Sequence, residues 1–79
     1  MISTKLDRLD KAILSELERH PTGINIAQLT SPFLLEKAPS TLRGRVMRLI
    51  ILGALAIERG HHEIICYPLT EEGIKRALE

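Results

Sequence analysis

Hydrophobic residues recur every three or four positions near the start of the chain, and this spacing predicts a first helix. Its apolar positions are Leu6, Leu9, Ile13, Leu14 and Leu17. Thr4 stands where an N-cap belongs, and Asp7, three residues later, stands where a capping-box partner belongs. The helix should end near His20, because Pro21 disfavours helical geometry in the residue before it.

A second helix should begin at Asn25, whose side-chain oxygen can accept a free backbone N–H, and continue through the apolar positions Ile26 and Leu29. Ser31 and Pro32 then indicate a restart, with Ser as the cap and Pro in the first helical position. We therefore expect a further short helical turn over residues 33–37.

The third helix, Pro39 to Leu52, combines two kinds of side chain at helical spacing. Its apolar stripe is Leu42, Val46, Leu49 and Ile50. Its other side gathers Ser40, Thr41, Gly44, Arg45 and Arg48. Arginine can form two hydrogen bonds to guanine or phosphate, hydroxyls can bond to either, and glycine lets a backbone approach closely, so this side is suited to a nucleic acid. The alternative is an ordinary amphipathic helix with solvated arginines.

After Gly53, which should cap the third helix, the apolar period changes from about 3.6 to 2. Residues 54–58 and Glu63–Tyr67 should form two strands joined by a turn over Arg59–His62. Thr70 then caps a short last helix. We expect its inner side to be Leu69, Ile74, Ala77 and Leu78. The fold class is thus α+β, mostly helical, in a single domain over residues 1–79.

Charge is unevenly divided along the 79 residues, although the net charge is only +1. Residues 37–62 hold five basic side chains and one acid, which gives +4, and the rest holds six basic and nine acidic side chains, which gives −3. Such a basic middle favours a domain with one electropositive face. No apolar run is long enough for a membrane span and no leader pattern is present, so we expect a cytoplasmic protein with no membrane partner.

The sequence gives only weak signs of a metal site or an enzyme active site. His61, His62 and Cys66 suggest a metal site, but neighbouring strand residues point to opposite faces and no further ligand completes the set. We therefore expect Cys66 to fill the core, with no metal and no cofactor. No nucleophile and base share a predicted pocket, so we do not expect an enzyme.

Two motifs resemble the winged helix-turn-helix domains of small transcriptional regulators such as the MarR and PadR groups. One is APSTLRGRVMRL, residues 38–49, which is similar to the opening of their recognition helices. The other is YPLTEEG, residues 67–73, which is similar to the run that leaves their wing for the last helix. The resemblance implies a three-helix core, a two-stranded β-hairpin wing and a short C-terminal helix.

The resemblance also implies a function: sequence-specific binding of double-stranded DNA by a transcription regulator, with the third helix in the major groove and the wing on the backbone. The implied contacts are Ser40, Thr41, Arg43, Gly44, Arg45, Arg48, Arg59, His61 and His62. We expect a homodimer on DNA, because one module offers little contact area. The sequence does not reveal whether a small-molecule effector binds.

Two alternatives stay open. The domain can instead bind protein, since the fold does not fix the function, or serve as a phage or plasmid accessory DNA-binding factor. The apolar end of the third helix, residues 50–52, should add to the core. However, Ile51 projects opposite the apolar stripe, so a subunit interface or a wing contact is the other interpretation.

Overall fold

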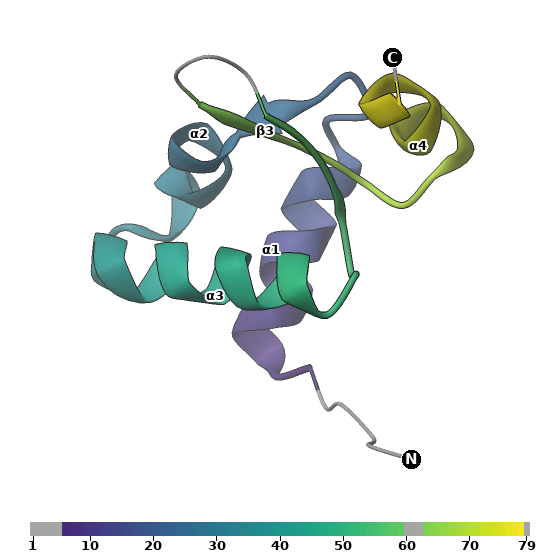
Figure 1. Ribbon diagram of the computed structural model, residues 1–79. Helices are drawn as coiled ribbons and strands as arrows, with labels where there is room; N and C mark the ends of the chain where they lie inside the picture. The colour runs from purple at the N-terminus through teal and green to yellow at the C-terminus, as the bar shows by residue number, and fades with distance from the viewer. Residues whose placement is uncertain (1–5, 60–62, 79) are drawn as a thin grey trace.

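The structure is a computed structural model that describes residues 6–59 and 63–78, and its architecture is α+β and mostly helical. The elements follow in the order α1 (Arg8–Glu18), β1 (Ile24–Asn25), α2 (Ile26–Thr30), a short 3-10 helix η1 (Ser31–Phe33), α3 (Pro39–Ile51), β2 (Ala56–Arg59), β3 (Ile64–Tyr67) and α4 (Glu71–Leu78). Figure 1 shows α1, α2 and α3 packed together below a small sheet, with α4 at one end of that sheet. The predicted α+β class is confirmed.

The sheet has three antiparallel strands in the order β1-β3-β2. β2 and β3 form the predicted hairpin, with Ala56 opposite Tyr67 and Arg59 opposite Ile64. β1 pairs with the other edge of β3, where Ile24 lies opposite Cys66. This third strand is not predicted by the sequence, because two residues are too few for a period-2 pattern to be visible.

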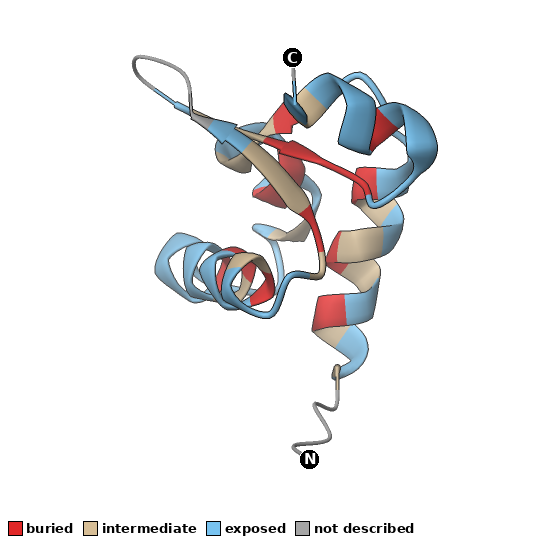
Figure 2. Cartoon of the chain, turned by 45° about the vertical axis from the view of Figure 1, so that its right-hand side comes forward, coloured by how far each residue is buried: buried red, intermediate tan, exposed pale blue. Residues whose placement is uncertain are grey.

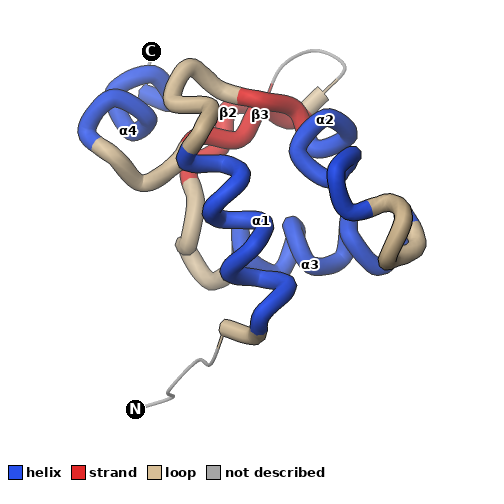
Figure 3. The backbone as a smooth tube through the Cα atoms, turned by 180° about the vertical axis from the view of Figure 1, so that it is seen from behind, coloured by secondary structure: helices blue, strands red, loops and turns tan. Residues whose placement is uncertain are grey.

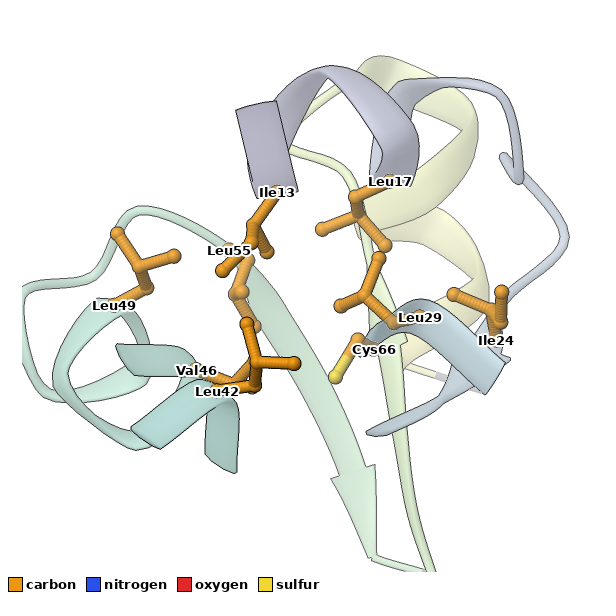
Figure 4. Close-up of a cluster of buried hydrophobic side chains, with 9 residues drawn as sticks. All are labelled: Ile13, Leu17, Ile24, Leu29, Leu42, Val46, Leu49, Leu55 and Cys66. Atoms are coloured by element: carbon orange, nitrogen blue, oxygen red, sulfur yellow. The ribbon is translucent and has the colours of Figure 1, made fainter. Parts of the chain in front are cut away.

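The core lies between the sheet and the first three helices, and it is largely aliphatic. The buried apolar residues that cluster there are Ile13, Leu17, Ile24, Leu29, Leu42, Val46, Leu49, Leu55 and Cys66, and Tyr67 is buried as well. Figure 4 shows these side chains converging from α1, α2, α3 and the strands. Cys66 is fully buried among these side chains, so it packs as a small hydrophobic residue, as the sequence predicts.

The start of α1 differs from the prediction. Asp7, rather than Thr4, is the N-cap, and the helix begins at Arg8. Asp7 accepts the Asp10 N–H through Oδ1 at 2.9 Å, and the Asp10 carboxylate accepts the Asp7 N–H at 3.1 Å, which completes a capping box. Thr4 lies outside the described residues. The sequence contains two overlapping cap patterns, and the second one forms.

The other helix ends mostly follow the sequence. Asn25 caps α2 by accepting the Gln28 N–H at 2.8 Å, and Thr70 accepts the Gly73 N–H at 3.0 Å at the start of α4. Gly53 follows α3 with φ of +73°, as its capping role requires. The prediction that Ser31 is an N-cap is wrong. Thr30 is the N-cap of η1, and its side chain makes no capping hydrogen bond.

Two expectations about burial are also wrong. In α4 the buried residue is Gly73, whereas Leu69, Ile74 and Leu78 are all exposed, because the helix packs against Pro68 through its glycine side. At the end of α3, Ile50 packs against the core but Ile51 is 82% exposed. Ile51 therefore contributes to the surface and not to the core.

Candidate nucleic-acid interface

α3 lies along the surface with one side on the core and the opposite side in solvent. Leu42, Val46 and Leu49 are fully buried. Pro39 occupies the first turn, where its missing N–H costs no intrahelical bond. Figure 2 shows buried residues only on the inner side of this helix, with its outer side exposed along the length. The predicted helix, with one buried face and one exposed face, is confirmed; contact of the exposed face with a nucleic acid stays a prediction.

The outward face of α3 is less basic than the sequence suggests. Ser40, Gly44, Met47 and Ile51, spaced four, three and four residues apart, fall within about 60° of one another, opposite the buried stripe. All four are exposed in the structure. A Cβ atom built at Gly44 would meet nothing within 4 Å, so the chain itself does not require a glycine there. We call these four residues the outward stripe.

Arg45 and Arg48 lie on the flank of α3 that faces α1, and not on its outward face. Figure 3 shows α1 crossing α3, which brings the first turn of α1 to this flank. The Arg45 guanidinium binds the Asp7 carboxylate and also lies 3.4 Å from Asp10 Oδ1. Arg48 Nη1 donates to Asp10 Oδ2 at 2.8 Å. Two arginines and two aspartates thus form an ion-pair cluster whose formal charges cancel.

The two carboxylates of this cluster differ in environment. The Asp10 side chain is 0% exposed, and it accepts bonds from the Asp7 backbone and from both guanidiniums. Asp7 is solvent-exposed, and its pKa is lowered from 3.8 to about 2 by the hydrogen bond from the Asp10 N–H and then by the Arg45 guanidinium. Asp7 therefore holds its negative charge beside α3 at neutral pH.

Among the remaining predicted contacts, Ser40, Thr41, Arg43 and Gly44 are all exposed on α3. Arg43 makes no ion pair with any residue that the structure describes, and it lies on the flank opposite Arg45. Arg59 is the last residue of β2, at the base of the hairpin turn. His61 and His62 lie outside the described residues. The structure thus brings four of the nine predicted residues to an open face and engages two others with α1.

Asp7 and Asp10 are the site residues that the sequence does not single out. The signal is present, because Asp7 and Asp10 have the spacing of a capping box directly before the apolar run of α1. The spacing does not identify the partners of the two acids, because Arg45 and Arg48 lie 35 to 41 positions away in the sequence.

Other features of the described residues lie apart from α3. No group of three or more His, Cys, Asp or Glu side chains there is arranged to hold a metal ion. Burial raises the pKa of the Cys66 thiol to about 11, which disfavours the thiolate needed for reactivity. A shallow hollow of about 110 Å³ separates Leu14 and Glu18 of α1 from Pro68 and Leu69. None of the described helices is both long enough and apolar enough to span a membrane.

Comparisons of the chain with protein-family models, with curated proteins and with solved structures found no match. Its function is therefore inferred from the residues and their geometry.

Proposed function

We propose that this chain is a winged helix-turn-helix domain that binds double-stranded DNA and regulates transcription, with α3 in the major groove and the β2–β3 hairpin as the wing. The observation that carries the proposal is the placement of α3. It is a thirteen-residue helix whose outward face is exposed from end to end, and it is followed directly by a hairpin and a short helix. A helix presented in this way fits the width of a major groove, about 12 Å.

The contacts with phosphate come mainly from cations that have no acidic partner. Lys37 and Arg43 are exposed and make no ion pair among the described residues, and we add Arg59, the last residue of β2, as the contact at the base of the wing. Arg45 and Arg48 contribute less, since Asp7 and Asp10 cancel their charge. His61 and His62, next to Arg59 in sequence, join the wing contacts when protonated, so binding should tighten below a pH of about 6.5.

The proposal includes a homodimer on DNA, in a cytoplasmic location. Exposed apolar side chains on α4, Ile74 and Leu78, and at the end of α3, Ile51 and Leu52, are the surfaces available for a subunit interface. Two modules would read half-sites about one helical turn apart. Analytical ultracentrifugation that finds a monomer both free and on a two-half-site duplex would contradict this part of the proposal.

Affinity for a random duplex over a salt series tests DNA binding directly. The logarithm of the binding constant should fall linearly with the logarithm of salt concentration, by about 0.9 per neutralised phosphate. One phosphate neutralised by each of Lys37, Arg43 and Arg59 predicts a slope magnitude of about 3 for one module. Absence of binding to any duplex at low salt would refute the proposal.

Two arginine variants make this test specific to the structure. Arg43→Ala should reduce the salt slope by about one, because it removes an uncompensated cation. Arg45→Ala should change the slope less, because it also releases a carboxylate partner. Equal effects from the two variants would show that the ion-pair cluster does not persist when DNA binds.

A protein-binding module is the second candidate, and one observation favours it. Met47, Ile51 and Leu52 are exposed at the end of α3, where a strictly DNA-binding surface would carry charges. Ile51→Ser should then abolish association with the protein partner.

A further inference from the structure

We propose that the outward stripe of α3 reads thymine methyl groups, so that the preferred sites are rich in A·T pairs and not in guanine. This inference rests on the proposed function, since it names the base class read by the same helix. It starts from the outward stripe, Ser40, Gly44, Met47 and Ile51, and from what the two flanks of α3 carry.

The residues that would read guanine are engaged elsewhere. A guanine edge is usually read by an arginine that offers two parallel donors to O6 and N7. Arg45 and Arg48 instead donate to Asp7 and to the buried Asp10. Releasing them onto a base would leave the Asp10 carboxylate with no charged partner in a site that is closed to water. The ion-pair cluster therefore opposes guanine readout.

The outward stripe offers different chemistry. Met47 is 38% exposed, and its unbranched thioether side chain adapts to irregular apolar surfaces. The open space above Gly44, one turn away, lets the helix backbone come close to a base edge. In the major groove the thymine 5-methyl is the apolar group that such a surface can cover. Ser40, at the N-terminal end, adds a hydroxyl that can bond to a base edge or a phosphate.

The charges beside the stripe match a groove rather than an apolar protein surface. Arg43 flanks Met47 on the side away from α1 and is without an ion pair among the described residues. Lys37 stands before the start of the helix and is likewise exposed. An apolar strip with cations at its margin is complementary to methyl groups on a groove floor between rows of phosphates.

Four short duplexes that differ only in base methylation test the inference: alternating A·T, the same duplex with uracil for thymine, alternating G·C, and the same duplex with 5-methylcytosine. The methyl is removed in one pair and added in the other, while the hydrogen-bonding groups of the major groove stay the same. Affinity is measured by fluorescence anisotropy at one low ionic strength. Within each pair, the methylated duplex should bind about fourfold more tightly than the unmethylated one for each methyl group covered.

Met47→Ala should bring the A·T to A·U affinity ratio toward one. Leu69→Ala is the matched control, because Leu69 is an exposed apolar residue just before α4, away from α3 and outside the surfaces proposed for DNA and subunit contacts (Figure 1). It should leave the ratio as in the unmodified chain. Thermal unfolding of both variants checks that the fold is retained.

The outcomes separate the inference from the proposed function. Equal affinity for A·T and A·U duplexes, or tighter binding to the G·C duplex than to the same duplex with 5-methylcytosine, overturns methyl readout and leaves DNA binding in place. A ratio that Met47→Ala does not change overturns the assignment of Met47. Failure to bind any of the four duplexes at low salt overturns the proposed function itself.

Discussion

Replacing Asp10 by alanine should destabilise the fold and strengthen non-specific DNA binding at the same time. Asp10 is fully buried at the first turn of α1, where it closes the capping box and receives Arg48 Nη1 at 2.8 Å. The substitution removes both interactions and one negative charge next to α3. Stability and affinity should therefore change in opposite directions, and both are measured on the same variant.

The magnitude follows from the contacts. Loss of the reciprocal capping-box bond, in which the Asp10 carboxylate accepts the Asp7 N–H, costs about 1 kcal/mol. The hydrogen bond to Arg48 would cost about 1.5 kcal/mol or more in a buried setting, but the Arg48 side chain is 44% exposed and is rehydrated when released, so about 1 kcal/mol is appropriate. The total is about 2 kcal/mol, which corresponds to a melting temperature roughly 8 to 16 °C lower for a domain of this size.

Urea and thermal unfolding followed by circular dichroism measure the stability change, with Glu18→Ala as the matched control. Glu18 is an exposed carboxylate on the same helix, without an ion pair among the described residues, so its removal should change stability by less than about 0.5 kcal/mol. Asp10→Asn keeps the shape and one acceptor oxygen, and it should lose about half as much as Asp10→Ala.

The DNA measurement is a salt series on the same variants. Asp10→Ala frees a guanidinium for phosphate, so the salt slope should steepen by about one relative to Glu18→Ala. If Asp10→Ala unfolds at the same urea concentration as Glu18→Ala, the ion-pair cluster does not hold α1 to α3 and the reasoning is refuted. If stability falls but the slope does not change, Arg45 and Arg48 take no part in binding.

Three further predictions concern stability and reactivity. Gly73→Ala should destabilise the fold, because a Cβ there would lie 2.1 Å from the Pro68 carbonyl oxygen. Gly44→Ala, in open space in α3, should instead stabilise the fold by about 0.5 to 1 kcal/mol. Melting curves of the two variants test this pair, and equal shifts in melting temperature would contradict the packing of α4. The pKa of Asp7 is lowered from 3.8 to about 2, so its stabilising effect is complete above pH 4 and is lost as pH falls toward 2. Asp7→Asn should therefore flatten the curve of unfolding free energy against pH between 4 and 2. An unchanged curve would contradict the role given to the Asp7 carboxylate. The Cys66 thiol, whose pKa burial raises to about 11, should react with iodoacetamide at neutral pH only after urea unfolding, and fast labelling of the folded chain would show that the core opens readily.

The sequence by itself determined most of the local structure, because each signal lies within a few residues of the element that it controls. Pro39 and Gly53 bound α3, Asn25 and Thr70 cap their helices, and the change of apolar period gives the hairpin. The apolar stripe of α3 also identifies its buried side. Periodicity is sufficient here, since helix and strand geometry fix which side chains share a face.

Only the tertiary structure decided what each remaining face meets. Periodicity places Arg45 and Arg48 away from the core stripe, but it does not say that α1 crosses that flank and supplies two acids. β1 becomes a strand only because β3 offers an unpaired edge beside it. The apolar side chains of α4 stay exposed because the close approach of Gly73 to Pro68 sets how that helix docks. These outcomes depend on contacts between residues far apart in the chain, which local patterns do not encode.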